Sequence, residues 1–308
     1  MALTVDSVAF LFPGQGAQTV GMGRWLCETY PAARAVFDRA AEILGYDLAK
    51  ICFDGPETKL NATEYSQPAL FVSSMAAVEV LRAEQPEFME KATACAGLSL
   101  GEYTAVCFAG GLEFESALRL VQQRGKAMQA AADQVDSGMA SILGLDLEQV
   151  IAVCERARKA DEVLLPANLL CPGNIAVSGH KTALDRLEPI ATEAGAMRVI
   201  PLPVAGAFHT PLMEPAVGAI RQALQASQPH STSLPVYSNV DAAAHRHEED
   251  IRDLLARQVV SPVRWEESIR KMLADGVEGF LEVGTGRVLR GTLKRIDRKV
   301  PTDGFGDQ

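Results

Sequence analysis

Several residue patterns are missing from this 308-residue sequence, and each absence excludes a class of protein. No apolar run approaches the roughly eighteen residues that a membrane span requires, so we expect no membrane association. The six cysteines form no CxxC pair and no zinc-ligand spacing, which predicts reduced and mostly packed thiols. The first residues lack the basic region and long apolar stretch of a signal peptide, so we expect a cytoplasmic protein.

Basic residues are also in the minority, with 29 Lys and Arg against 39 Asp and Glu and a net charge of -10. This balance argues against a nucleic-acid partner, which would need a basic face. The densest basic segment is Arg287–Lys299, where an acidic partner could dock. Its spacing also fits a solvated amphipathic helix with basic residues near the C-terminal end.

Short apolar runs alternate with helical periodicity along most of the chain, which is typical of an α/β protein with a largely parallel sheet. The expected strands are Val8–Phe12, Thr93–Ala96, Val236–Ser238 and Phe280–Val283. The expected helices are Ala32–Leu44, Pro68–Glu84, Phe114–Ala132, Pro211–Gln225 and Glu248–Gln258.

A different order of elements interrupts this alternation. We expect strand, helix, strand, strand, helix and strand at Met139–Leu145, Leu147–Lys159, Val163–Ala167, Ile175–Ser178, Lys181–Ala194 and Met197–Pro201. This βαββαβ order predicts a small ferredoxin-like subdomain at residues 137–202, inserted into a discontinuous core of residues 1–136 and 203–308. A site in the cleft between the two parts is expected. The connection Asn168–Asn174 contains a Pro-Gly pair and is expected to be a turn.

The segment Cys95–Glu102 carries the strongest signal for chemistry. A short strand of small residues ends in the GLSLG sequence of residues 97–101, and a helix follows. This is the setting of a nucleophile elbow, so we expect an α/β-hydrolase-like core with Ser99 as the candidate nucleophile. Because a bare GxSxG occurs by chance in roughly one chain in ten of this length, the setting matters more than the pentapeptide. The alternative is that Ser99 caps the helix.

A serine nucleophile needs a base, and the sequence offers five histidines. His209 differs from the others because it lies in an apolar, glycine-containing loop just before an expected helix. We take it as the candidate base, with a structural buried histidine as the alternative. For His245 and His247, in a charged and solvated stretch, no third ligand is indicated, so no metal site is expected.

The glycine-rich stretch VAFLFPGQGAQTVGMG, residues 8–23, needs an explanation other than a phosphate cradle. Thr19 stands where a dinucleotide fingerprint requires glycine, and the Gly-Lys-Ser/Thr of a Walker loop is missing. An acyl-enzyme route requires two backbone N–H donors for its oxyanion. Leu100 can supply one and Gln15 the other.

Arg124 lies in an expected helix of otherwise apolar and small residues, beside a glycine that indicates close packing. An arginine there can hold a substrate carboxylate through paired charged hydrogen bonds. An internal salt bridge to Glu102 or Glu113 is equally compatible with the sequence.

Together these segments resemble the malonyl-CoA:acyl carrier protein transacylases of fatty-acid synthesis and the related acyltransferase domains of polyketide synthases. The resemblance covers nearly the whole chain. Its segments are, in order, FPGQGAQTVGMG, QPAL, GLSLGEYTA, QQRGK, GAFHTPLM, RQVVSPVRW and EVGTGRVL. It implies a malonyl-serine intermediate at Ser99 with His209 as base, in a ping-pong transfer from malonyl-CoA to the phosphopantetheine thiol of acyl carrier protein. CoA and phosphopantetheine then arrive as substrate parts, and no cofactor is expected.

The resemblance also assigns the surrounding residues. Arg124 becomes the clamp for the malonyl carboxylate, and Gln15 and Leu100 become the oxyanion hole. The main-chain carbonyl of Gln258 becomes the group that orients the histidine. Asn168 and Phe208 are expected to contact substrate, with Phe208 as a steric filter that favours malonyl over methylmalonyl. A monomer is the default expectation for the oligomeric state.

Two departures from the family pattern lie near this pocket. Leu98 replaces a histidine before the nucleophile, and Leu170 replaces an asparagine in the insert. We hypothesise that these positions face one another and exchange a hydrogen bond for an apolar contact. Alternative functions are a serine acyl hydrolase or thioesterase, a trans-acting polyketide acyltransferase or malonate decarboxylase component, and a non-catalytic carrier-binding module.

Overall fold

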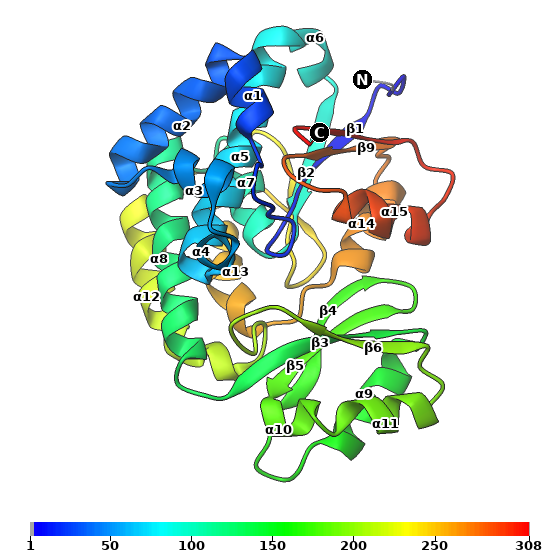
Figure 1. The fold of residues 1–308 in the computed structure, drawn as a ribbon. Coiled ribbons are helices and arrows are strands. Elements are labelled where there is room, and N and C mark those ends of the chain that lie inside the picture. Colours follow the sequence, from blue (N-terminus) through cyan, green and yellow to red (C-terminus); the bar gives the residue numbers. More distant parts are fainter. Residues whose placement is uncertain (1–2, 308) are drawn as a thin grey trace.

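The computed structural model describes residues 3–307, and its larger sheet is built around a buried strand, β1 (Val8–Phe12). The strand order is β10-β9-β1-β2-β7-β8, with parallel neighbours except for the antiparallel pair β7–β8. The neighbouring strands β2, β1 and β9 are labelled in Figure 1. The other strands are β2 (Ala92–Gly97), β7 (Val236–Tyr237), β8 (Ala244–His245), β9 (Gly279–Val283) and β10 (Thr302–Phe305). The sheet is mixed but largely parallel, as expected.

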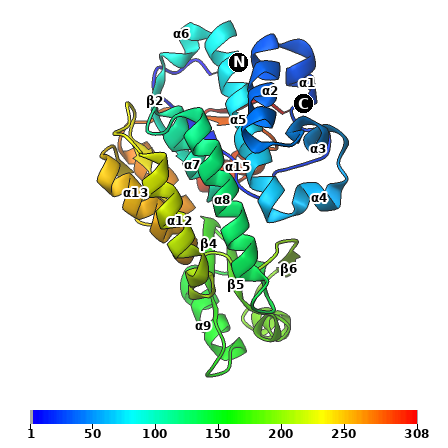
Figure 2. The same ribbon diagram turned by 90° about the vertical axis from the view of Figure 1, so that its left-hand side faces the viewer.

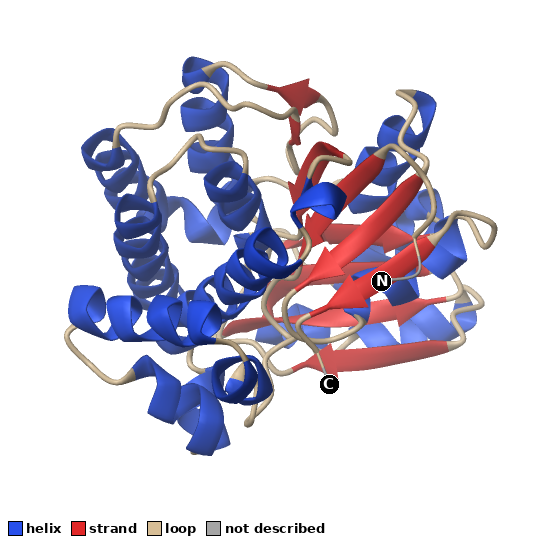
Figure 3. Cartoon of the chain, turned by 90° about the horizontal axis from the view of Figure 1, so that it is seen from above, coloured by secondary structure: helices blue, strands red, loops and turns tan. Residues whose placement is uncertain are grey.

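Helices cover both faces of this sheet (Figure 3). Alternate residues of β1 point to opposite faces, so Phe10 and Phe12 pack with the cluster that includes α2, α5, α7 and α8, whereas Ala9 and Leu11 pack with α14 and α15. The helices before the small sheet are α1 (Arg24–Thr29), α2 (Pro31–Leu44), α3 (Leu48–Asp54), α4 (Glu57–Asn61), α5 (Thr63–Glu84), α6 (Pro86–Met89), α7 (Leu100–Phe108) and α8 (Phe114–Ala132).

The helical elements after the small sheet are η1 (Pro211–Met213), α12 (Glu214–Ser227), α13 (Glu248–Arg257), η2 (Gln258–Val260), α14 (Trp265–Ala274) and α15 (Val288–Ile296). α12 lies along α8, and α8 along α5, although the chain between α8 and α12 leaves to form the small sheet (Figure 2). The chain thus returns from the small sheet to pack α12 against α8 in the larger part.

The second sheet is antiparallel and follows α8 directly. Its order is β4-β5-β3-β6, with one helix between β3 and β4 and two short helices between β5 and β6. Its elements are β3 (Ser137–Leu143), α9 (Leu147–Ala157), β4 (Leu164–Cys171), β5 (Asn174–His180), α10 (Lys181–Leu184), α11 (Leu187–Glu193) and β6 (Arg198–Leu202). A separate apolar cluster joins this sheet to α9 and α11.

Several expected boundaries were wrong. β4 continues to Cys171, so the turn expected over Asn168–Asn174 is confined to Pro172 and Gly173; irregular pairing with β5 and a bridge from Asn168 to Val263 extend the strand. The helix expected at Lys181–Ala194 is two helices, and the one expected at Pro211–Gln225 begins as the 3₁₀ turn η1. α5 begins five residues before Pro68, which lies inside the helix.

All six cysteines are free, and five are buried. Over residues 3–307 no helix has the length and apolarity needed to cross a membrane, and no group of three His, Cys, Asp or Glu could hold a metal ion. The basic segment forms α15, where Arg290 pairs with the buried Glu282 and Arg295 donates to the carbonyl of Pro172. Part of its charge is therefore engaged within the fold.

Glycines allow the larger sheet and α7 to approach very closely beneath Ser99. A Cβ on Gly101 would lie 2.1 Å from the carbonyl oxygen of Phe12, and one on Gly97 would lie 1.9 Å from the carbonyl carbon of Gly101. Both neighbours are backbone atoms of buried elements and have little freedom to move. The two glycines of the GLSLG sequence are therefore required by packing.

We expect Gly101→Ala to destabilise the protein by about 4 kcal/mol or more, because the added methyl collides with the β1 backbone. Gly218→Ala is the matched control: Gly218 is exposed in α12 and has open space around its Cβ position. That substitution should stabilise by about 0.5–1 kcal/mol through helix propensity. Urea unfolding measures both, and equal effects would contradict the close crossing.

Candidate active site

Ser99 occupies the sharp turn between β2 and α7, with φ 52° and ψ −102°. Such a backbone conformation is uncommon for a residue with a side chain and must be held by its surroundings. Asn239, just after β7, holds it: its Oδ1 accepts from the Ser99 N–H at 2.7 Å, and its Nδ2 donates to the Gly97 carbonyl at 2.8 Å. Ser99 makes no side-chain cap to α7, so the capping alternative was wrong.

His209 faces the serine hydroxyl from the loop before η1. Its Nε2 lies 2.8 Å from Ser99 Oγ, and its Nδ1 lies 2.9 Å from the main-chain carbonyl oxygen of Gln258. A carbonyl can only accept, so Nδ1 carries the proton and Nε2 of the neutral ring can accept from the serine. Burial, aided by the positive charge of Arg124, lowers the pKa of His209 to about 4. The imidazole is therefore neutral near pH 7.

Arg124 approaches the same hydroxyl from α8 and is 1% exposed. Its Nη2 donates to Ser99 Oγ at 3.0 Å and to Gln258 Oε1 at 2.9 Å, and its Nη1 donates to Gln67 Oε1 at 2.8 Å. The guanidinium carbon lies 4.9 Å from the centre of the Tyr103 ring. Burial lowers the pKa of Arg124, but an arginine stays protonated in proteins.

The salt bridge considered as an alternative for Arg124 does not form. Among residues 3–307 no carboxylate lies within ion-pair distance of its guanidinium, and Glu113 is exposed on the surface. Its Nε also lacks a hydrogen-bond partner within the described part of the chain. A buried cation without an anion is costly. The arrangement thus leaves a charged donor available to an anionic group beside Ser99.

A small cavity of about 70 Å³ opens in front of these groups, between the larger sheet and the small one. It is lined by every expected site residue except Gln258, together with side chains from β3, β4 and β6. The lining residues are Gly14, Gln15, Gln67, Leu98, Ser99, Leu100, Arg124, Met128, Met139, Asn168, Leu202, Val204, Phe208 and His209. The cavity therefore collects residues that lie far apart in the sequence.

The glycine loop after β1 lies directly against the turn that carries Ser99. A Cβ on Gly14 would lie 2.3 Å from the main-chain oxygen of Leu98. This close approach brings Gln15 to the cavity wall. Leu100, which also lines the cavity, is the first residue of α7, so its N–H has no acceptor within the helix.

Asn168 and Phe208 also line the cavity. Asn168 Oδ1 is buried and has no hydrogen-bond partner among the residues described. Phe208 is buried beside His209. Leu98 and Leu170 both pack into the apolar cluster on the α14 and α15 face of the sheet. The proposed direct contact between these two leucines stays a prediction.

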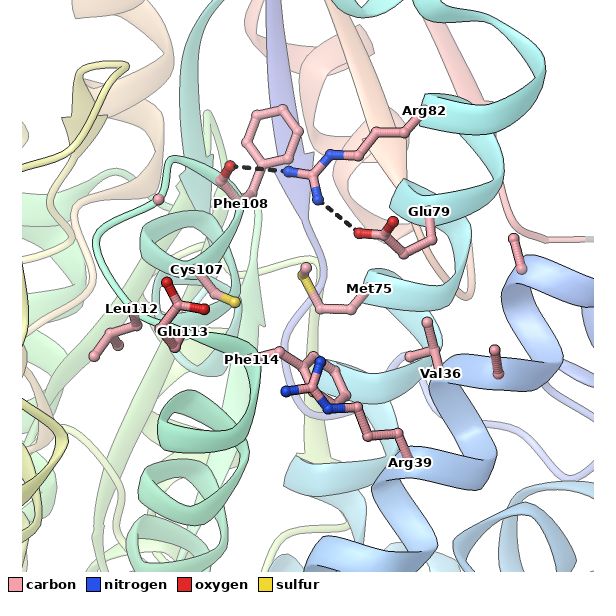
Figure 4. Close-up of a pocket in the computed structure, with 13 residues that line it drawn as sticks. Val36, Arg39, Met75, Glu79, Arg82, Cys107, Phe108, Leu112, Glu113 and Phe114 are labelled. Atoms are coloured by element: carbon pink, nitrogen blue, oxygen red, sulfur yellow. Dashed lines mark hydrogen bonds and ion pairs between the residues drawn. The ribbon is translucent and has the colours of Figure 1, made fainter.

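Another pocket, of about 530 Å³, lies between α2, α5 and the start of α8 (Figure 4). Its ionisable lining residues are Arg39, Glu79, Arg82, Cys107 and Glu113. Arg82 pairs with Glu79, and Arg39 stacks over Phe114, so the pocket walls are stabilised by their own contacts. It contains none of the residues that surround Ser99, and the candidate active site is the smaller cavity.

Sequence reasoning assigned no role to Gln67 or Asn239. Gln67 belongs to the QPAL segment but gave no chemical signal of its own, because an amide side chain is common in helices. Asn239 follows β7, the neighbour of β2, and carboxyl ends of parallel strands meet at one edge of a sheet. A search for polar residues at strand ends would have found it.

The family model described as "Acyl transferase domain" matches residues 9–299. Fold and site together thus define an acyltransferase. A malonyl CoA-acyl carrier protein transacylase of Bacillus subtilis is 40% identical over 305 residues, covering 98% of this chain and 94% of the relative. A human mitochondrial malonyl-CoA-acyl carrier protein transacylase is 43% identical, and the match covers 92% of this chain and 75% of the human protein. The chain belongs to the malonyl CoA-acyl carrier protein transacylase family.

Solved structures agree with this grouping. The malonyl CoA-acyl carrier protein transacylase of Coxiella burnetii has a TM-score of 0.93 and 37% identity, covering 98% of this chain and 94% of that one. A second solved structure is a malonyl-transacylase in complex with its type II PKS acyl-carrier protein. It has a TM-score of 0.92 and 37% identity, and the match covers 98% of this chain and 96% of that one.

The neutral state of His209 predicts a pH dependence of stability. On unfolding the imidazole regains its ordinary pKa of about 6.5, so below that pH the unfolded chain binds a proton that the native protein, with a pKa of about 4, does not bind. Stability is therefore lost as the pH falls from 6.5 toward 4. Between pH 7.5 and 4.5, wild type should lose roughly 2–3 kcal/mol more than His209→Gln in urea unfolding. Parallel losses would contradict a neutral buried His209.

Proposed function

We propose that the protein transfers a malonyl group from malonyl-CoA to the phosphopantetheine thiol of acyl carrier protein through a malonyl-serine intermediate. The observation that carries this proposal is the contact of Ser99 Oγ with both a neutral His209 and a buried Arg124 that has no carboxylate partner within residues 3–307. The names of the relatives support the same donor and acceptor.

In the first half-reaction, His209 Nε2 accepts the Ser99 proton while Oγ attacks the thioester carbonyl of malonyl-CoA. The N–H groups of Gln15 and Leu100 donate to the oxyanion that develops on the carbonyl oxygen. Collapse of the tetrahedral intermediate breaks the carbon–sulfur bond, and the imidazolium gives the proton to the departing CoA thiolate. The carbonyl of Gln258 keeps Nδ1 protonated and the ring oriented throughout.

The second half-reaction reverses these roles. The phosphopantetheine thiol gives its proton to His209 Nε2 and attacks the malonyl ester. A new thioester forms, the ester bond to Oγ breaks, and Ser99 regains its proton from the imidazolium. Because the sulfur atoms arrive with the two substrates, the residues of the cavity provide acid-base catalysis and charge stabilisation, and the proposal includes no metal or cofactor.

Acyl selectivity follows from the anionic end of the substrate. The malonyl carboxylate accepts from Arg124, whose hydrogen bonds to Gln67 and Gln258 are made to neutral amides and include no direct carboxylate partner within residues 3–307. The unpartnered Asn168 Oδ1 is an acceptor on the cavity wall, and Phe208 restricts space near the acyl α-carbon. A methyl branch at that carbon would be disfavoured.

The proposal includes the division of the chain. Residues 137–202 form a ferredoxin-like subdomain, which the β4-β5-β3-β6 order supports, and residues 1–136 and 203–308 form an α/β-hydrolase-like core. The carrier protein approaches the cavity between them to deliver its thiol. A cytoplasmic location, a monomeric state and the lack of a membrane or nucleic-acid partner stay predictions.

Intact-protein mass spectrometry tests the proposed intermediate. After incubation with malonyl-CoA, wild type should carry one malonyl group, and addition of phosphopantetheinylated carrier protein should remove it. Ser99→Ala should carry none, because the attacking oxygen is missing. Ser66→Ala, which removes a different buried hydroxyl, is the control and should behave as wild type.

Other outcomes of this experiment distinguish the alternatives. Continuous CoA release without transfer to the carrier would indicate a serine hydrolase or thioesterase. Binding of the carrier without an adduct or CoA release would indicate a non-catalytic carrier-binding module. Equal labelling of Ser99→Ala would remove Ser99 from the proposed role.

Arg124→Ala should lower kcat/KM for malonyl transfer by at least about 30-fold, since loss of a buried charge pair costs about 2–5 kcal/mol. Acetyl transfer should be kept or gained, because acetyl has no carboxylate. Arg119→Ala, on the exposed side of the same helix, is the matched control and should change neither rate. An unchanged malonyl preference in Arg124→Ala would contradict the carboxylate clamp.

A further inference from the structure

Glu102 is a buried carboxyl group beside the cavity that the proposed reaction does not use. It lies in the first turn of α7, three residues after Ser99, and is 2% exposed. Its Oε2 accepts from Gln258 Nε2 at 2.6 Å and from the Asn239 N–H at 3.1 Å. This one oxygen atom links α7 to Asn239, just after β7, and to Gln258 in η2. Both residues also form hydrogen bonds with the main chain of Ser99.

The hydrogen bonds of the Gln258 side chain fix which way its amide group is turned. Gln258 Nε2 donates to Glu102 and to the main-chain oxygen of Ser99 at 2.9 Å, while Gln258 Oε1 accepts from Arg124 Nη2 at 2.9 Å. A primary amide has one donating end and one accepting end. If this amide rotated by half a turn, its NH₂ group would face the guanidinium, and two donors would oppose each other.

We propose that Glu102 is a positioning residue for acyl selectivity. Its carboxylate holds the Gln258 amide with the oxygen toward Arg124 and thereby keeps the guanidinium beside Ser99, where it meets the carboxylate of the acyl group. This inference rests on the proposed malonyl transfer and adds a residue that acts on it without touching substrate.

The charges around Glu102 are consistent with this role. Arg124 on α8 and Tyr103 on α7 are the ionisable neighbours that interact with it, and Arg124 favours its ionised form. Burial raises the pKa of Glu102 to about 7, against the opposing hydrogen bonds from Gln258 and Asn239. The oxygen that accepts from the Asn239 N–H also accepts from Gln258, so it selects the NH₂ end of the amide, and the ionised form strengthens this contact with a charge that a glutamine at position 102 would lack.

The test compares wild type, Glu102→Gln and Glu282→Gln with malonyl-CoA and acetyl-CoA as donors to the carrier. Glu282 is the matched control because it is also a buried carboxylate that accepts backbone N–H groups, those of Leu289 and Arg290, but it lies away from the cavity. We expect Glu102→Gln to raise KM for malonyl-CoA and to lower the malonyl-over-acetyl preference by about tenfold, in line with loss of a charge-assisted hydrogen bond. Glu282→Gln should keep the preference of wild type.

Gln258→Met gives a second variant in case Glu102→Gln does not fold. It removes the amide but keeps the main-chain carbonyl that accepts from His209. It should lower the preference by a similar factor, and in the double variant the two losses should not multiply, because both act through one amide.

A malonyl-over-acetyl preference within twofold of wild type in folded Glu102→Gln or Gln258→Met would overturn the inference. An equal loss of transfer rate with malonyl-CoA and acetyl-CoA would also overturn it. These failures differ from failure of the proposed function. If wild type forms no malonyl-enzyme, the transfer itself is wrong; if wild type prefers malonyl and the variants do also, only the role of Glu102 is wrong.

Discussion

The arrangement of the site depends on one buried positive charge. Arg124 is surrounded by neutral acceptors and an aromatic ring, and within residues 3–307 no carboxylate neutralises it directly. Such burial is costly, and hydrogen bonds to Gln67, Ser99 and Gln258 offset part of the cost. The remaining imbalance favours an anionic ligand. Burial is the main cause of the low pKa of His209, and the charge of Arg124 adds to it because a nearby cation disfavours a second one.

The second constraint is the strained turn that presents Ser99. A positive φ at a residue with a side chain costs about 1–3 kcal/mol and persists where the surroundings enforce it. Here the enforcement comes from Asn239, which holds both sides of the turn, and from the contact of Gly101 with the β1 backbone. The rigid sheet thus fixes the serine, while the small sheet supplies the other wall of the cavity.

Sequence patterns predicted those features that depend on local order. Val8–Phe12 and Phe114–Ala132 have the bounds expected from their apolar runs, because both elements are defined by residues close in the chain. The extension of β4 past Asn168 was missed because it depends on a bridge to Val263, nearly a hundred residues away. Ser99, His209 and Arg124 could be chosen by residue type, but the contact of Glu102 with Gln258, 156 positions apart, could not.

The central claim, that the buried guanidinium of Arg124 receives the acyl carboxylate, is tested most directly by a crystal structure of the enzyme acylated with malonyl at Ser99. We predict that both carboxylate oxygens lie within hydrogen-bond distance of the guanidinium and that the ester carbonyl oxygen lies near the N–H groups of Gln15 and Leu100. A carboxylate directed to solvent, with Arg124 in contact only with Gln67 and Gln258, would contradict the account.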